Sequence, residues 1–155
     1  MTARRVITGV GADGRSTVVS DGSPPSAFDM GQGGGRAGAN TVVVTELWTT
    51  GGPQPEPTWV DPTVGIEAFT VEVPPGAARW IFVEYGGSLE AAIHQTDTID
   101  YDVVIDGSLE LILEDGTSVT LEAGDSVVIP GIMHGWRSGP NGCRLAVTMV
   151  GIQRQ

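Results

Sequence analysis

Four Asp-Gly pairs divide this chain of 155 residues into short pieces, and they lie at Asp13-Gly14, Asp21-Gly22, Asp106-Gly107 and Asp115-Gly116. Aspartate and glycine both tolerate the positive φ angles that a tight β-hairpin turn requires. Short β-rich runs surround the last two pairs, at 101–105, 108–114, 117–121 and 126–129, and no segment keeps a helical period. We therefore expect antiparallel strands arranged as a meander or barrel, with few or no helices.

Composition supports one all-β domain. The chain is long enough to bury a core, 40% of its residues are hydrophobic, and 23 Gly and 10 Pro provide many turns. Further strands are expected at 41–48, 67–73 and 79–85. The glycine-rich run 31–39 predicts a flexible loop or lid, and the proline-rich run 51–62 predicts an extended connection.

Charge and residue types exclude several classes of function. A net charge of -11 without a basic run predicts no nucleic-acid partner. The chain contains no lysine, so Schiff-base chemistry on PLP and a lysine-bearing phosphate loop are excluded, and neither nucleotide nor PLP is expected. No apolar run resembles a signal peptide or a membrane span, which predicts a cytoplasmic protein with no membrane partner.

Two histidines are the only ones in the chain, and both lie in apolar, strand-like stretches. Histidine titrates near neutral pH and is the commonest metal ligand, so His94 and His134 are the first candidates for a site. On an unbroken strand, His94 would share one face with the polar residues at alternate positions, namely Thr96, Thr98, Asp100 and Asp102. The alternative is a partly solvated turn in which His94 is merely hydrogen-bonded.

These stretches resemble the two motifs of the cupin superfamily, G(X)5HXH(X)3,4E(X)6G and G(X)5PXG(X)2H(X)3N. His94 matches the first histidine, Asp100 takes the place of the glutamate, and Gly107 closes the first motif. The run 124–134 matches the second motif up to His134, with one residue fewer between glycine and histidine. Thr96 replaces the second histidine of the first motif.

The resemblance implies a small single-domain cupin over 1–155, an antiparallel jelly-roll β-barrel. Residues 1–60 would supply N-terminal strands, the glycine-rich loop and the proline-rich connection, and 61–155 would form the barrel core carrying both motifs. Similar small cupins are often encoded near secondary-metabolite genes. They usually form homodimers through N-terminal strands, for which 4–8 and 41–48 are the candidates here.

The resemblance also implies a metal site, since His94, Asp100 and His134 have the inventory of a facial triad with two histidines and one carboxylate. Such a triad suits Fe, and also Mn, Ni or Zn. Without a metal, the same three groups are candidate catalytic residues for acid–base chemistry.

Other side chains are candidates for substrate binding. Thr96 would lie on the same inward face as His94, and Trp136 follows His134 by two residues. A bulge would turn the Tyr101 hydroxyl inward, whereas on a regular strand Tyr101 would be a surface or interface residue. Arg137 is either a ligand for a substrate carboxylate or a solvated surface residue. The lone cysteine, Cys143, is most simply a small buried side chain.

Three functions are consistent with these residues. The first is a lyase or isomerase that performs dehydration, decarboxylation or cyclisation on a small, largely apolar metabolite. The second is a metal-dependent dioxygenase that uses the triad. The third is a non-catalytic small-molecule binder.

Overall fold

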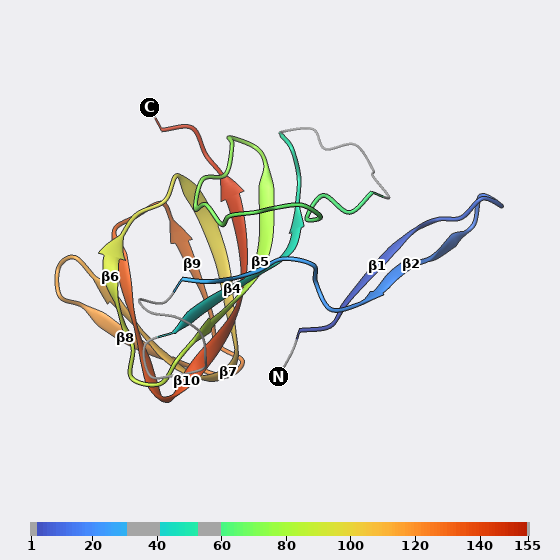
Figure 1. Ribbon diagram of the computed structural model, residues 1–155. Coiled ribbons are helices and arrows are strands. Elements are labelled where there is room, and N and C mark those ends of the chain that lie inside the picture. Colours follow the sequence, from blue (N-terminus) through green and yellow to red (C-terminus); the bar gives the residue numbers. More distant parts are fainter. Residues whose placement is uncertain (1–2, 31–40, 53–59, 155) are drawn as a thin grey trace.

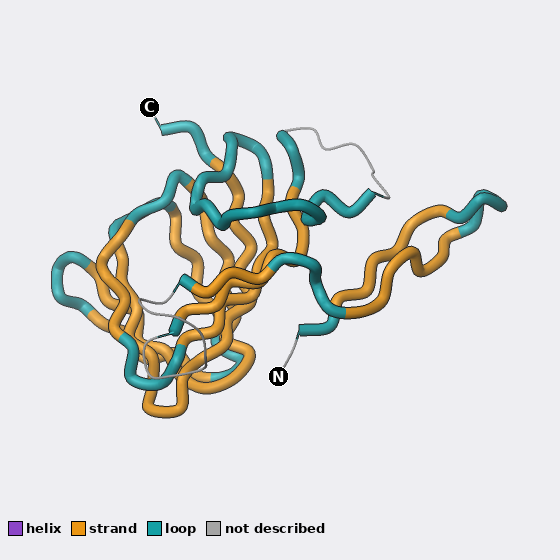
Figure 2. Tube along the Cα trace, viewed as in Figure 1, coloured by secondary structure: helices purple, strands orange, loops and turns teal. Residues whose placement is uncertain are grey.

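The computed structural model describes residues 3–30, 41–52 and 60–154. These residues form ten strands and no helix, as the sequence predicts (Figures 1 and 2). None of them forms a helix able to span a membrane. The strands are β1 (Arg5–Val10), β2 (Ser16–Gly22), β3 (Ala27–Asp29), β4 (Val42–Thr49), β5 (Ala78–Tyr85), β6 (Glu90–His94), β7 (Thr98–Leu113), β8 (Ser118–Glu122), β9 (Ser126–Pro130) and β10 (His134–Gly151).

Two long strands, β7 and β10, organise the barrel by pairing antiparallel along most of their lengths. The first half of β7 and the second half of β10 pair with β9 and β5, and β5 leads on to β4 and β3. Their other halves pair with β8 and β6. Each long strand therefore belongs to both layers of the barrel. Register shifts in their pairing, between Ser138 and Cys143 and between Arg144 and Leu145, lie where the strands pass from one layer to the other.

The Asp-Gly pairs divide into two groups. Asp13-Gly14 connects β1 to β2 and Asp115-Gly116 connects β7 to β8, with both glycines at positive φ, as predicted. The prediction is wrong for the other two pairs, because β2 includes Asp21 and Gly22 and β7 runs through Asp106 and Gly107.

Gly107 has a different role, which depends on a neighbouring strand. Its φ is 76°, and a Cβ added there would collide with the carbonyl oxygen of Gly142 on β10. Glycine is therefore required where the two long strands approach each other at the bend.

The strand predicted at 67–73 is absent, since these residues form bends and irregular backbone. Phe69 nevertheless packs against the core and stacks under the Arg79 guanidinium at 5.3 Å. Its apolar alternation reflects this packing rather than sheet pairing. The glycine-rich run 31–39 and most of the proline-rich run fall outside the described residues.

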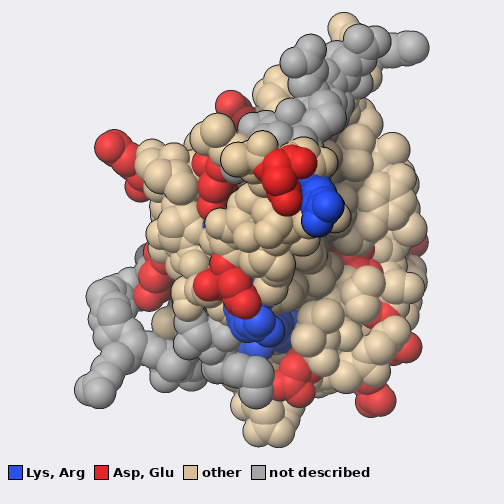
Figure 3. All heavy atoms as spheres, turned by 90° about the vertical axis from the view of Figure 1, so that its right-hand side faces the viewer, with Lys and Arg blue, Asp and Glu red and all other residues tan. Residues whose placement is uncertain are grey.

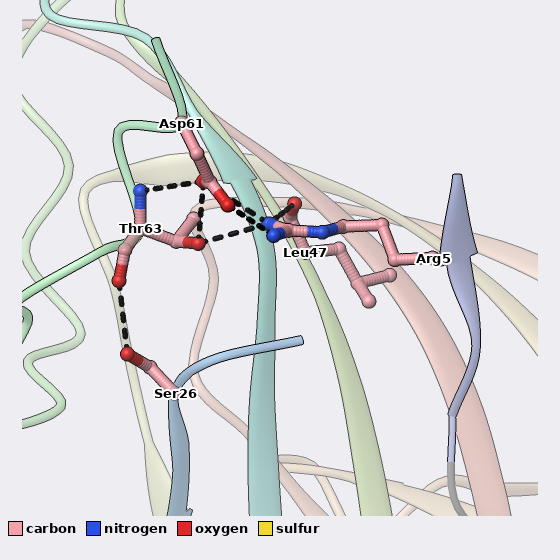
Figure 4. A network of polar contacts seen from close by, with 5 residues as sticks. All are labelled: Arg5, Ser26, Leu47, Asp61 and Thr63. Carbon is pink, nitrogen blue, oxygen red and sulfur yellow. Dashed lines mark hydrogen bonds and ion pairs between the residues drawn. The ribbon is translucent and has the colours of Figure 1, made fainter. Parts of the chain in front are cut away.

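A β-hairpin formed by β1 and β2 projects from the barrel (Figure 1). The buried Arg5 guanidinium at its base donates to the Leu47 carbonyl (2.8 Å) and the Thr63 hydroxyl (2.8 Å), and it forms an ion pair with Asp61 (Figure 4). Thr63 in turn accepts a hydrogen bond from Ser26 through its carbonyl (2.9 Å). This network attaches the hairpin to the outside of β4.

A buried ion pair joins β4 to β5. Glu46 is fully buried, and its Oε1 lies 3.3 Å from Nε of Arg79, whose side chain is 12% exposed. Burial raises the pKa of Glu46, although the charge of Arg79 opposes this shift. On the surface of the molecule, in contrast, acidic side chains predominate over basic ones, as on the face in Figure 3.

Candidate functional site

In the first half of β7, polar side chains point into the barrel and apolar side chains point outward, which is the reverse of the usual pattern. Thr98, Asp100 and Asp102 point into the barrel and are 1%, 6% and 4% exposed. The alternate residues Tyr101 and Val103 are apolar and lie outside, 49% and 40% exposed. Burying polar groups in a barrel costs free energy unless they are satisfied, so this inversion marks the interior next to β7 as a candidate site.

The two histidines meet as a pair across neighbouring strands. His94, the last residue of β6, is opposite His134, the first residue of β10, and their ring centroids lie 4.5 Å apart. His134 is buried, whereas His94 is exposed to solvent. Trp136 meets the His134 ring edge to face at 5.5 Å. The predicted meeting of the histidines is therefore confirmed.

Both imidazoles are oriented by the main chain. Nδ1 of His94 lies 3.0 Å from the Ala92 carbonyl, and Nδ1 of His134 lies 2.9 Å from the Ile132 carbonyl. Because a carbonyl only accepts hydrogen bonds, each neutral ring carries its proton on Nδ1, which leaves Nε2 as the basic nitrogen. These two carbonyls therefore orient the two rings.

A cavity of about 170 Å³ lies against these groups. Its polar wall comprises His94, Thr96, Asp100, Asp102 and His134, and Tyr85 also lines it. Most of the remaining wall is apolar and includes the following residues: Val42, Val44, Phe69, Ile81, Val83, Trp136, Leu145, Val147 and Met149. The described lining contains no arginine, so the cavity has carboxyl and imidazole groups but no fixed cation.

Burial shifts the pKa values of Asp100, Asp102 and His134 in the direction that favours the neutral form. Burial, and secondly the charge of Asp100, raises the pKa of Asp102 to about 8. Burial also raises the pKa of Asp100, opposed by a hydrogen bond from Thr98 and by the charge of His94. The pKa of His134 is lowered, chiefly by burial. At neutral pH, Asp102 is therefore mostly protonated and His134 is a neutral base.

Two buried carboxyl oxygens in this wall lack partners. Oδ1 of Asp100 and Oδ1 of Asp102 make no hydrogen bond with any described residue. An unsatisfied buried polar atom typically costs about 1–3 kcal/mol. Both atoms are thus available to a ligand in the cavity.

The proposed metal triad does not fit the side chains as they lie. Among residues 3–30, 41–52 and 60–154, no three His, Cys, Asp or Glu side chains are placed to hold one metal ion. Asp100 and His94 are near enough for their charges to interact. A third ligating group does not join these two, so the described side chains do not fit a facial triad as they lie.

No protein-family model matches this chain. Curated fungal proteins share a segment with it. Phomopsin biosynthesis cluster protein C' of Diaporthe leptostromiformis is 41% identical over 69 residues, covering 44% of this chain and 35% of that protein. Oryzines biosynthesis cluster protein J of Aspergillus oryzae is 41% identical over 64 residues, covering 41% and 36%.

A third relative, the cupin-domain-containing oxidoreductase srdD of Neurospora crassa, is 33% identical over 54 residues, covering 35% of this chain and 28% of that protein. The chain thus spans about a third of the length of the curated relatives it matches.

Solved structures decide the fold. The cupin domain of Cnp3 from Schizosaccharomyces pombe superposes with a TM-score of 0.55 and 14% identity, over 97% of this chain and 89% of that chain. The chain has a cupin fold. A putative ethanolamine utilization protein Q from Salmonella typhimurium LT2 superposes on this chain with a TM-score of 0.51 and 16% identity, over 99% of both chains.

Within this fold, Thr96 and Trp136 line the cavity as predicted. The Thr96 hydroxyl shares a 2.7 Å hydrogen bond with that of Thr98. The prediction for Tyr101 is wrong, because β7 keeps its regular register there and turns the phenol outward. Asp102 belongs to the predicted inward row but was not among the predicted site residues, although strand alternation alone points to it.

Two further residues are structural. Arg137 forms surface ion pairs with Glu90 (3.2 Å) and Glu110 (2.7 Å), which supports the solvated alternative. Cys143 is buried in the core, as predicted, and burial raises the pKa of its thiol to about 11. A thiol with that pKa is a poor nucleophile at neutral pH.

Proposed function

We propose that this cupin is an enzyme of small-molecule secondary metabolism, of the lyase or isomerase class, that moves protons with His134 and His94. The observation that carries the proposal is the pair of main-chain-oriented imidazoles on the wall of a mostly apolar cavity. The names of the two biosynthesis-cluster relatives support the metabolic setting.

His134 is the better base of the two. Its ring is 2% exposed, it is neutral at pH 7 because burial lowers its pKa, and its Nδ1 is bound to the Ile132 carbonyl. A neutral, desolvated imidazole whose Nε2 is free accepts a proton from a substrate without first losing one. Trp136 packs against the ring and shields it from solvent.

The reaction would begin when Nε2 of His134 removes a proton from a carbon next to a carbonyl group. The C–H electron pair forms an enol or enolate, and the carbonyl oxygen gains charge or a proton. Return of the proton to another carbon isomerises the substrate, whereas loss of a β-hydroxyl together with that proton gives water and an alkene. His94, at the solvent-exposed side of the pair, would exchange protons with water.

Deuterium exchange tests this step without knowledge of the natural substrate. Cyclohexanone and 2-cyclohexenone are ring-sized ketones, and NMR in D₂O follows the loss of their protons next to the carbonyl. We expect wild-type protein to accelerate exchange and His134→Gln to reduce the acceleration at least about 100-fold, the scale of general-base catalysis. Arg137→Gln, a surface change, is the control. No acceleration by the wild type, or equal rates in His134→Gln, would contradict the proposal.

The name of the oxidoreductase relative supports a second candidate, the metal-dependent dioxygenase, although no three metal-ligating side chains of the described residues converge as they lie. It predicts that the protein takes up one Fe(II) per chain under argon and that His134→Gln abolishes this uptake. Plasma mass spectrometry of the washed protein measures the metal. A wild type that takes up no Fe(II) would exclude the oxygenase candidate and leave the proton-transfer proposal in place.

We also propose that the chain forms a homodimer, for which the outer face of the barrel is a further candidate interface beside 4–8 and 41–48. One row of side chains crosses the outer face of β5, β10, β7 and β9, and each residue in it pairs with the next. The row is Trp80, Thr148, Tyr101 and Val128. Trp80, Tyr101 and Val128 are 45%, 49% and 56% exposed. A row of large exposed apolar side chains is typical of an interaction surface.

A further inference from the structure

We propose that Asp102 is the specificity-determining residue of the cavity, where its carboxyl group binds the hydroxyl group of a neutral substrate about the size of one six-membered ring. This inference deepens the proposed function, since it names the substrate class for the same cavity. It rests on that function only in treating the bound molecule as a substrate. Ligand binding tests it independently of turnover.

The placement of Asp102 is the first argument. Its side chain is 4% exposed, it lines the cavity, and its Oδ1 has no hydrogen-bond partner among the described residues. The fold does not require a carboxyl group there, because the same inward row continues with Val104, which is 1% exposed. A ligand hydroxyl would satisfy the unpartnered oxygen.

The surroundings of Asp102 place it apart from the histidines. The hydroxyl of Thr98 bonds to that of Thr96, two residues after His94, so this end of β7 lies toward His94. Asp100 and then Asp102 follow along the strand, opposite Ile129 and Val127 of β9. Asp102 therefore lies beyond Asp100 as seen from His94. A substrate whose hydroxyl binds Asp102 extends its ring along the apolar wall toward the imidazoles.

Cavity size and charge define the substrate class. A cavity of about 170 Å³ is close to the roughly 150 Å³ that is known to hold benzene. The described lining has two carboxyl groups and no arginine, so a carboxylate or phosphate would be buried without a counter-ion. The apolar walls also disfavour a cation, which leaves a neutral hydroxylated ring.

Four single-ring probes separate these possibilities: phenol, toluene, benzoate and benzylammonium. Ligand-observed NMR titration measures their dissociation constants. We expect phenol to bind the wild type and benzoate to bind at least 10-fold more weakly. Asp102→Leu should weaken phenol about 10-fold, the value of one hydrogen bond, and leave toluene unchanged or tighter.

Two variants keep the test decisive. Asp102→Asn retains a hydrogen-bonding oxygen and should keep phenol affinity within about 3-fold, and Asp106→Leu, on the exposed outer side of β7, should change nothing. If Asp102→Leu does not fold, the phenol-to-toluene affinity ratio of the wild type decides, and a ratio near one overturns the inference.

The inference is also overturned if phenol does not bind, if Asp102→Leu weakens phenol and toluene equally, or if benzoate or benzylammonium binds more tightly than phenol. Phenol binding that depends on Asp102, without ketone exchange, would contradict the proposed function alone. Exchange that depends on His134, without selective phenol binding, would contradict this inference alone.

Discussion

Replacing Asp102 by asparagine should make the protein more stable, by an amount that grows with pH. The change keeps the shape of the side chain and removes its ability to ionise. In the folded chain the pKa rises from its ordinary value of 3.8 to about 8. The folded state therefore binds this proton more tightly than the unfolded state, and the wild type loses stability as pH rises between these two values.

The magnitude follows from the shift. Each pH unit between the two values costs the wild type about 1.4 kcal/mol, so the penalty is about 1 kcal/mol near pH 4.5 and about 4 kcal/mol near pH 7. Above about pH 8 it becomes constant. Since asparagine has no such penalty, the advantage of Asp102→Asn should follow the same curve.

Urea unfolding followed by tryptophan fluorescence measures this curve at several pH values, with EDTA present throughout. A stability difference near 4 kcal/mol would raise the melting temperature by roughly 8–16 °C for a domain of this size. Asp106→Asn, at an exposed position, should give a flat difference across pH. An Asp102→Asn advantage that is the same at every pH, or a loss of stability above pH 8, would refute the reasoning.

Three further predictions concern the fold and assembly. Gly107→Ala should destabilise the protein by about 2–3 kcal/mol in urea unfolding, because the new side chain meets both a positive φ and a backbone collision. Gly116→Ala, where φ is positive but the space is open, should cost only about 1 kcal/mol. Glu46→Ala should cost about 3–5 kcal/mol in the same assay, because it leaves the Arg79 guanidinium without its buried partner. Trp80→Glu should shift sedimentation equilibrium from dimer to monomer without lowering the melting temperature of the monomer, and a wild type that is monomeric at all concentrations would contradict the dimer.

The sequence predicts those parts of the fold that depend on local chemistry. Gly14 and Gly116 stand in hairpin turns whose geometry requires them, and the residues around each turn are sufficient to predict it. Gly107 has the same Asp-Gly sequence, but its requirement comes from Gly142, a residue distant in sequence. No local pattern distinguishes a turn glycine from one that permits two strands to touch.

The candidate site follows the same division. The spacing of the two motifs predicted that His94 and His134 belong to one site. Strand alternation predicted that Asp100 and Asp102 point to the same side of their strand. The sequence did not reveal that main-chain carbonyls orient the imidazoles, because any residue two positions earlier supplies a carbonyl. An inward Tyr101 required a bulge, and this stretch of β7 is regular, so its side chain lies outside.

The pairing of β7 with β10 also implies an order of assembly. It begins near the connection, where His134 faces Leu113, and ends where Gly151 faces Thr98, so successive pairs close longer and longer loops. Loop closure costs more entropy as the loop lengthens, which favours zippering from the His134 end. Refolding should therefore fix His134 early and bring Asp100 and Asp102 opposite β10 late. Amide hydrogen exchange pulsed during refolding would then show protection spreading along β10 from Gly135 toward Val150.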